Sequence, residues 1–348
     1  MQRLESECRC KILFMKIAIV KLSALGDIIH AMVVLQFIKN HYPKMEIDWV
    51  VEGDFKKLLE FHPNINQVHE VNIKKARKKK SFYSLFKELR KVRHFGSYDI
   101  VIDMQGLIKS AIISRLISSK STLGFDKSSA REGFSSIFYS QTFNIGYDEN
   151  VIERNFSLIK FALDLPFNMK EIQNKLPFVF PSQKHLISNL SNIKKNIILI
   201  PGASHSSKRY PVEKFSELTN LLDAHYLIIW GNEEEKIIAK KIKDLSPKVS
   251  ICERLSLDSL ISLVSMVDLV IGSDTGPTHL AWAQNIPSIT LFGQTPGYRN
   301  TYITEHNQII ESNSEVNPYK INKQDNSIKD IEVEEVFRMS QRLLNKLV

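Results

Sequence analysis

The sequence predicts an α/β protein with two Rossmann-like domains, each a doubly wound parallel sheet, and three observations support this fold class. Short apolar runs alternate with helical patterns in both halves of the chain, and this alternation is typical of a parallel sheet covered by helices. The 348 residues exceed the length that one hydrophobic core usually serves. A proline-marked stretch at 166–181 lacks clear periodicity. We therefore expect one domain over 15–180 and a second over 181–330.

The first half alternates strand-length apolar runs with amphipathic patterns. The segment at 16–21 reads as a first buried strand, because it is short, apolar and rich in β-branched residues. By the same criteria, further strands are expected at 46–51 and 99–103, with helices at 27–40, at 54–61 and from Leu107.

The second half repeats the alternation after the proline-marked stretch. Apolar runs bounded by polar turns predict strands at 196–200, 225–230, 249–252, 269–272 and 288–292. Helices are expected between them, near 211–223, 233–245, 257–266 and 277–284. A last amphipathic pattern within 331–348 predicts a closing helix, which we expect to pack back onto the first domain.

Every polar motif of interest follows one of the expected strands. In doubly wound sheets, ligands bind beyond the carboxyl ends of the strands. Two such domains joined by a hinge are expected to place these ends across a central cleft. The functional loops are therefore expected at 23–30, 103–109, 203–208, 231–235 and 274–279.

Composition limits the class of protein. The chain is 43% apolar and 24% charged, as in soluble globular proteins, and it has no apolar run of about 18 residues that could span a bilayer. Three cysteines are too few and too unevenly spaced for a disulfide framework or a zinc site, which fits a reducing cytoplasm. Residues 1–14 have no periodic pattern and are expected to be a tail or an upstream extension.

The positive charge is concentrated in one block. Between residues 74 and 93, ten Lys or Arg against one Glu give a local balance of +9, equal to the net charge of the whole chain. This block requires water or an anionic partner. A solvated face, nucleic acid, anionic lipid head groups and a phosphorylated substrate are all compatible, although no nucleic-acid motif accompanies it.

The most informative motif is DTGPTHLAWA at 274–283, which follows an apolar strand and opens a helix. A helix start presents free N–H groups and a positive dipole end, and Pro277 suits its first turn. Such an end binds phosphate. With Thr275, Gly276 and His279 close by, the pattern favours a diphosphate site over an ordinary capped turn.

A carboxylate opens the helix after the first strand. Asp27 follows Gly26 in the loop-to-helix segment 21–30, which lacks the Gly-x-Gly-x-x-Gly dinucleotide fingerprint. Two interpretations stay open for this residue. Asp27 either caps the helix or faces the substrate as a general base.

Two further strand-following loops carry polar residues. The segment 201–211 offers hydroxyls and Lys208, but it lacks the Gly-Lys-Ser/Thr of a P-loop, so an ATPase is excluded. We expect it to lie beside Asp274 at the same sheet edge. The acidic run 233–235 begins a helix, where the dipole alone favours carboxylates. One of these carboxylates could instead hold a ribose diol.

Taken together, these residues resemble the bacterial lipopolysaccharide heptosyltransferases of glycosyltransferase family 9. The resemblance runs from residue 15 to near the end of the chain, and the order of its motifs is more specific than any one of them. Within the family, the segments 103–110 and 130–139 favour type I over type II. The motifs lie at 21–30, 103–110, 130–139, 152–154, 208–211, 230–235 and 273–279.

The resemblance implies a GT-B fold and an inverting transfer of L-glycero-D-manno-heptose from ADP-heptose to a Kdo residue of Kdo-lipid A. No cofactor and no metal are implied, and the enzyme would work peripherally on the cytoplasmic face of the inner membrane. Asp27 corresponds to the general base. The implied donor-binding residues are Ser204, Lys208, Glu235, Leu255, Asp274, Thr275, Gly276 and His279, and those for the anionic acceptor are Lys74, Lys75, Arg77, Arg131 and Arg154.

The chain departs from the family pattern at two places. Ala203-Ser204 stands where relatives often have paired threonines, and Gln294 interrupts the usual Gly-Pro-Thr turn. Two rival functions stay open. Heptosyltransferase II differs in its acceptor, whereas a non-catalytic nucleotide-sugar or anionic-glycolipid binding protein would not need Asp27.

Overall fold

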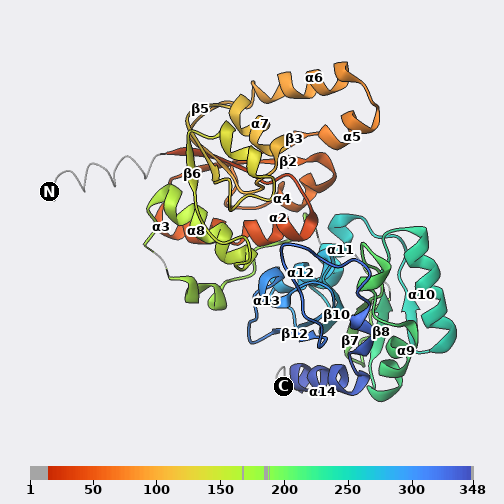
Figure 1. Cartoon of the computed structure of the whole chain (residues 1–348). Helices are drawn as coiled ribbons and strands as arrows, with labels where there is room; N and C mark the ends of the chain where they lie inside the picture. The colour runs from red at the N-terminus through yellow and green to blue at the C-terminus, as the bar shows by residue number, and fades with distance from the viewer. Residues whose placement is uncertain (1–14, 167, 184–186, 188, 346–348) are drawn as a thin grey trace. The chain divides into compact units, whose positions relative to one another are not determined.

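A computed structural model describes residues 15–166, 168–183, 187 and 189–345 (Figure 1). The chain divides into two compact units between Phe178 and Val179, two residues before the boundary expected from sequence. The expected tail, 1–14, lies outside the described residues. Within the described part of the chain, no helix is long and apolar enough to cross a membrane.

The first unit contains a parallel sheet of six strands in the order β3-β2-β1-β4-β5-β6. Strand β1 lies at its centre, where Ile19 pairs with Trp49 on one side and Ile102 on the other. The chain runs from β1 outward through β2 and β3 and then returns to the other side of β1. The strands are β1 (Lys16–Val20), β2 (Glu46–Glu52), β3 (Gln67–Val71), β4 (Ser97–Asp103), β5 (Ser118–Phe125) and β6 (Gln141–Phe143).

The helices of the first unit differ from the expectation in two places. The pattern at 27–40 forms two helices that meet at Val33, and the basic block, expected only as charged surface, forms a helical hairpin. The helices are α2 (Leu25–Met32), α3 (Val34–His41), α4 (Lys56–Leu59), α5 (Ile73–Lys78), α6 (Phe82–Val92), α7 (Ile108–Leu116) and α8 (Val151–Leu163), with 3-10 turns η1 (Gly53–Phe55), η2 (Gly133–Phe138) and η3 (Met169–Asn174).

The second unit also has a six-stranded parallel sheet, in the order β12-β11-β10-β7-β8-β9. Its central strands are continuous apolar runs, as expected for strands buried on both faces. Expected and observed bounds agree at two strands, β7 and β11. The strands are β7 (Asn196–Ile200), β8 (His225–Ile228), β9 (Val249–Ile251), β10 (Leu269–Ser273), β11 (Ser288–Phe292) and β12 (Asn307–Glu311).

Helices of the second unit follow the expected positions closely, and α10 matches its expected bounds. They are α9 (Val212–Leu221), α10 (Glu233–Leu245), α11 (Leu257–Val264), α12 (Gly276–Ala283), α13 (Gly297–Asn300) and α14 (Val333–Asn345), with η4 (Ser206–Lys208) and η5 (Ser327–Asp330).

The closing helix does not pack as expected. We expected 331–348 to return to the first domain, but α14 packs on α9 and on β10 and β11 of the second unit. Val333, Val336, Leu343 and Leu344 belong to the buried core of that unit. The amphipathic pattern correctly indicated a buried face but carried no information about the surface that covers it.

Each sheet has one point where the strand order reverses, between β1 and β4 in the first unit and between β7 and β10 in the second. Loops leaving the carboxyl ends of these neighbouring strands diverge to opposite faces of the sheet, which leaves a crevice for ligands. The loops at these points are 21–27 and 104–108 in the first unit, and 201–208 and 274–276 in the second.

Candidate active site

An ion pair joins the two loops at the reversal point of the second unit. Lys208, at the end of the turn after β7, donates from Nζ to Asp274 Oδ2 at 2.9 Å. Both side chains are largely buried. The expectation that the 201–211 loop lies beside Asp274 is therefore confirmed.

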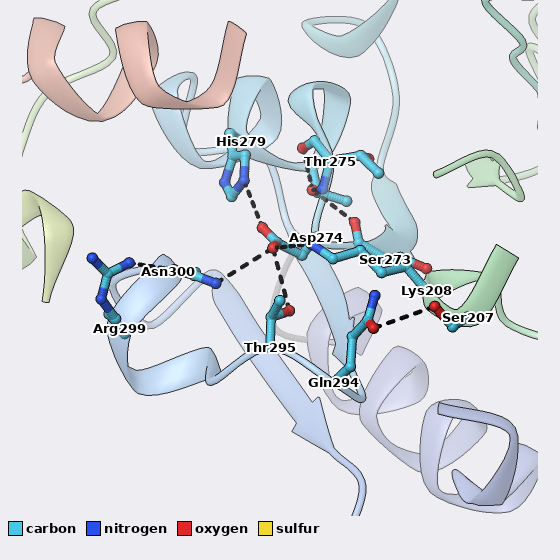
Figure 2. A network of polar contacts seen from close by, with 11 residues as sticks. Ser207, Lys208, Ser273, Asp274, Thr275, His279, Gln294, Thr295, Arg299 and Asn300 are labelled. Carbon is cyan, nitrogen blue, oxygen red and sulfur yellow. Dashed lines mark hydrogen bonds and ion pairs between the residues drawn. The ribbon is translucent and has the colours of Figure 1, made fainter. Parts of the chain in front are cut away.

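Asp274 is the centre of a polar network (Figure 2). Its carboxylate accepts hydrogen bonds from His279 Nε2 at 3.1 Å, Thr295 Oγ1 at 3.4 Å and Asn300 Nδ2 at 3.5 Å, besides the Lys208 ammonium. Burial alone would raise the pKa of this carboxyl, but the His279 hydrogen bond and the Lys208 charge outweigh it and hold the pKa well below its usual range. Asp274 is thus ionised before any ligand binds.

The start of α12 lies directly after this carboxylate. Thr275 occupies the N-cap position and donates its N–H to Thr278 Oγ1 at 3.3 Å, while Pro277 stands in the first turn. The hydroxyl oxygens of Ser273 and Thr275 are buried, and neither has a hydrogen-bond partner among the described residues. Buried polar atoms normally have partners, so these hydroxyls indicate where a polar ligand would complete the site.

A pocket of about 360 Å³ adjoins the α12 start. Its lining combines polar side chains such as Asp274 and Thr275 with apolar ones such as Leu255 and Leu260. Six of the eight predicted donor-binding residues line it, while Lys208 and His279 contact Asp274 instead. The lining consists of Ile200, Gly202, Ala203, Ser204, Ile229, Trp230, Gly231, Glu235, Leu255, Leu260, Asp274, Thr275, Gly276 and Pro277.

Glu235 is held in the pocket wall by its neighbours. Its Oε2 accepts the N–H of Gly231 at 2.7 Å, and a Cβ at Gly202 would lie 2.4 Å from the Glu235 carboxyl carbon. A side chain at position 202 would therefore require the Glu235 carboxylate to move, because real Cβ contacts are essentially never so close. Of the three acidic residues at the start of α10, the pocket selects Glu235.

Three polar residues of this site were given no role in the sequence analysis, although Gln294 was noted as a departure from the family pattern. Thr295 and Asn300 bond to Asp274, and Gln294 accepts a 3.2 Å hydrogen bond from Ser207, the neighbour of Lys208. They lie in the segment after β11, the strand next to β10. Their position after a strand was the signal that could have identified them.

In the first unit, the loops after β1 and β4 are tied together. The N–H groups of Leu22 and Ser23 both donate to Gln105 Oε1, at 3.0 and 3.1 Å. Lys21 Nζ donates to the carbonyl of Met104 at 2.7 Å. The polypeptide leading to Asp27 is therefore fixed against the neighbouring strand end.

Asp27 lies in the first turn of α2, with an exposed side chain. Its Oδ2 accepts the N–H of Ala24 at 3.0 Å, so Asp27 does cap the start of α2. A carboxylate has four lone-pair sites, and this bond uses one of them. Capping and proton abstraction are therefore compatible.

Two pockets of about 530 Å³ each lie beside this loop. They share Ile73, Arg77 and Lys109, so they adjoin each other. One includes Arg131 and the apolar residues of α6 and α7, and the other reaches Ser23 and Ala24. Arg77 and Lys74 are thereby brought near the Asp27 turn, as the acceptor prediction requires.

The charged groups of this surface are largely uncompensated. Lys74 and Lys75 face Asp54 at 3.7 and 3.6 Å, but these pairs are exposed to solvent and therefore weak. Arg77 and Arg131 are exposed, and neither side chain makes an ion pair or hydrogen bond within the described residues. Free guanidinium groups around a concavity suit carboxylate or phosphate ligands.

Glu52 and Lys109 are residues of this surface that the sequence analysis did not assign. Glu52 is buried, and its Oε1 accepts the N–H of Lys74 at 3.1 Å, which fixes the start of α5. Burial raises the pKa of the Glu52 carboxyl above its usual value. Lys109 lies in the family motif at 103–110, but the sequence analysis assigned it no role. In the structure, it lines both pockets.

Arg154 does not join this surface, contrary to the acceptor prediction. Its side chain is 6% exposed, and its guanidinium donates to the carbonyls of Ser129 at 2.6 Å, Ile145 at 3.2 Å and Gly146. It also stacks on Phe125, 4.6 Å from the ring centroid. Arg154 therefore holds the loop that leads to Arg131, because its donors are already used by backbone carbonyls.

Among the described residues, no group of three or more His, Cys, Asp or Glu side chains is arranged to hold a metal ion. Cys252 is buried, and burial raises the pKa of its thiol to about 11. This thiol is therefore unsuited to act as a nucleophile near neutral pH.

Two doubly wound parallel sheets in separate units, each with a crevice at its strand-order reversal, are the architecture of the GT-B fold. The model of glycosyltransferase family 9 (heptosyltransferase) matches residues 82–330. The chain therefore belongs to this family and is a glycosyltransferase.

Similar proteins agree with this assignment. The lipopolysaccharide heptosyltransferase 1 of Campylobacter coli is 40% identical, and the match covers 94% of this chain and 99% of that protein. The enzyme of the same name from Escherichia coli is 29% identical over 83% of this chain and 91% of its own. The solved structure of E. coli heptosyltransferase WaaC with ADP aligns with a TM-score of 0.77 at 24% identity, covering 94% of this chain and 100% of that one.

Proposed function

We propose that this protein is a lipopolysaccharide heptosyltransferase 1, which transfers L-glycero-D-manno-heptose from ADP-heptose to a Kdo residue of Kdo-lipid A. Two similar proteins with this name, at 40% and 29% identity, support the assignment. The observation that carries it is the Lys208–Asp274 pair at the start of α12, next to a pocket lined by both polar and apolar side chains.

The donor fits this pocket by its chemistry. Leu255 and Leu260 offer an apolar surface to the adenine, and the Glu235 carboxylate suits the ribose diol. The diphosphate is placed at the N–H groups of α12, where the helix dipole and the Thr275 hydroxyl favour an anion. Lys208 then adds a positive charge beside it.

Transfer with inversion needs one displacement. Asp27 accepts the proton of the attacking acceptor hydroxyl as that oxygen bonds to the anomeric carbon, while the bond from this carbon to the diphosphate breaks. The negative charge that develops on the departing ADP is stabilised by Lys208 and the α12 N–H groups. Both groups are in place before the reaction.

The acceptor is placed on the surface formed by Arg77, Arg131 and Lys109 beside Ser23 and Ala24. The Kdo carboxylate and nearby phosphates supply the anionic groups that these side chains lack as partners. Lys74 and Lys75 add to the attraction. Such an acceptor is carried by a membrane lipid, so the enzyme would work peripherally on the cytoplasmic face of the inner membrane.

The decisive experiment supplies the purified protein with ADP-heptose and either Kdo-lipid A or its monoheptosylated form, and follows the products by mass spectrometry. We expect one heptose to be added to Kdo-lipid A, with full activity in the presence of a chelator. Transfer only to the monoheptosylated acceptor would identify a type II enzyme. Binding of ADP-heptose without transfer to either acceptor would identify a non-catalytic binding protein.

A further inference from the structure

Helix α6 has an apolar inner face and an aromatic outer face. Leu85, Leu89 and Val92 pack against the core of the first unit. The side chains of Phe82, Tyr83 and Phe86 are 91%, 76% and 63% exposed. We call these three residues the aromatic face. Single exposed apolar residues are common, but three large ones within two turns mark an interaction surface.

The surroundings of the aromatic face are strongly basic. The aromatic face is preceded by Lys78, the last residue of α5, and by Lys79 and Lys80 in the turn between α5 and α6, where Lys80 has a φ of 49°. Lys87, Arg90 and Lys91 lie further along α6 and are exposed, whereas Glu88 is the only acidic residue of the block. The occupant of this surface must therefore combine negative charge with an apolar layer.

A bilayer with anionic lipids has both properties. Tyrosine favours the boundary between head groups and acyl chains, where its ring is buried and its hydroxyl stays hydrated. Phenylalanine supplies the buried apolar contact of helices that lie at this boundary. Lysines on the flanks attract anionic head groups. An amphipathic helix lying in the interface plane is a known mode of peripheral binding.

We propose that α6 is the membrane-docking element of this protein and that Phe82, Tyr83 and Phe86 enter the head-group layer of an anionic bilayer. This proposal deepens the proposed function, because a lipid-borne acceptor requires contact with a membrane. It goes beyond attraction by the lysines, since it assigns the apolar contact to specific side chains.

The position of α6 connects docking with the acceptor surface. Leu85 and Leu89, on the inner face, line the pocket that also contains Arg77 and Arg131. The same helix therefore presents the aromatic face outward and forms a wall of the acceptor pocket. Figure 1 shows α5 and α6 as neighbouring helices at the edge of the first unit. Docking through α6 would bring this pocket to the surface from which the acceptor's head group projects.

The test uses vesicles of phosphatidylcholine with and without phosphatidylglycerol, and needs no sugar substrate. For the triple variant Phe82→Ser, Tyr83→Ser and Phe86→Ser, we expect the partition coefficient on anionic vesicles to fall about ten-fold or more, although the charge is unchanged. Transfer to a soluble, deacylated acceptor should stay at the wild-type level. The matched control replaces Ile193 and Leu245, two exposed apolar residues of the second unit, with Ser and should partition like the wild type.

Depth of insertion is measured separately with Tyr83→Trp. We expect its added fluorescence to be quenched by lipids brominated on the acyl chains, over the background of the native tryptophans. Wild-type partition by the triple variant, or no added quenching in Tyr83→Trp, would overturn the proposal. Polyuridylate is the competing ligand, because exposed aromatic side chains among lysines also suit single-stranded RNA. Binding of polyuridylate but not of vesicles, lost in the triple variant, would assign the surface to RNA.

These outcomes are independent of the transferase assay. If vesicle binding fails but Kdo-lipid A is glycosylated, the docking proposal is wrong and the proposed function stands. If vesicles bind through the aromatic face but no heptose is transferred, the proposed function is wrong and the docking surface stands.

Discussion

The two units treat charge in opposite ways at their candidate sites. In the second unit, Asp274 is bonded to Lys208 and His279, and the whole network is largely buried. In the first unit, Arg77 and Arg131 have no partner within the described residues and lie exposed. The charges of the network in the second unit are therefore paired before any ligand binds, whereas those of Arg77 and Arg131 in the first unit are unpaired among the described residues.

This difference teaches how each substrate would be recognised. A pre-formed ionic network costs little reorganisation when a diphosphate arrives, and burial shields it from salt. Exposed guanidinium groups act over a Debye length of about 8 Å at physiological salt, so salt weakens them readily. We therefore expect donor binding to depend weakly on ionic strength and acceptor binding to depend on it strongly.

The largest effect is expected from Asp27→Asn. The amide oxygen can still accept the Ala24 N–H, but the group cannot remove a proton, so turnover should fall roughly 100-fold or more. ADP-heptose affinity should stay within a few-fold. Steady-state kinetics and donor titration measure both quantities. Asp27→Ala is the companion variant, which loses the cap as well. Retained turnover in Asp27→Asn would leave Asp27 with the capping role alone.

Acid should affect the two units at different pH. Burial lowers the pKa of His62, in the first unit, from 6.5 to about 4. In the unfolded chain, His62 is therefore protonated below pH 6.5, whereas in the folded unit it stays neutral down to about pH 4. The free energy of unfolding consequently falls between these two pH values, by at most about 3 kcal/mol. The pKa of Asp274 is also lowered, but its contribution is lost only below about pH 4, the usual range of an aspartate.

Hydrogen exchange resolved by unit measures this difference. Between pH 7 and pH 4, we expect amides of β1 and β2 to lose protection before those of β7 and β10. His62→Asn can keep the bond that Nδ1 accepts from the Asn64 N–H and should remove most of the pH dependence. His94→Asn, at an exposed histidine of the same unit, should leave it unchanged. Equal acid sensitivity of both units in the wild type would contradict the assignment to His62.

Lys208→Ala tests the paired charges around Asp274 in the second unit. It removes a charge-assisted hydrogen bond from a largely buried carboxylate, which typically contributes about 1.5–3 kcal/mol. We expect kcat/KM for ADP-heptose to fall about 10- to 100-fold, with little change in the acceptor constant. Lys195→Ala, which breaks an exposed pair with Asp268 at 3.0 Å in the same unit, is the control. Unchanged donor kinetics in both Lys208→Ala and Asp274→Ala would refute the donor site.

The smallest effect is expected from Arg131→Gln, at one of the exposed arginines of the first unit that have no partner among the described residues. An exposed guanidinium contributes about 1 kcal/mol to binding an anion, so the apparent acceptor constant should rise about five-fold for a soluble acceptor. The rise should shrink as salt is added. Arg338→Gln, at an exposed arginine of α14, is the control. A rise that does not depend on salt would show that Arg131 is buried by the bound acceptor.

Much of the fold follows from local pattern. The apolar runs at 196–200 and 288–292 match β7 and β11, because strands buried on both faces need continuous apolar sequence. The helices α5 and α6 were not expected, since the net charge of their segment hides the weak spacing of Leu85, Leu89 and Val92. A high net charge therefore does not exclude a helix, because a narrow apolar face is enough to pack it against the core.

The geometry of the proposed donor site was more predictable than that of the proposed acceptor surface. Lys208 and Asp274 both follow strands that are neighbours in the sheet, so strand order alone brings them together. Arg154 could not be predicted correctly, because its partners are the backbone carbonyls of Ser129, Ile145 and Gly146. Backbone acceptors are present at every position and leave no sequence signal.

The contact between Gly202 and Glu235 has an evolutionary consequence. A side chain at position 202 and the carboxylate at position 235 compete for the same volume. A larger residue at 202 requires the Glu235 side chain to move, although Gly202 lies in the loop after β7 and Glu235 in the first turn of α10. In heptosyltransferases that share this pocket, the two positions should vary together, and a larger residue at 202 should accompany a shorter one at 235.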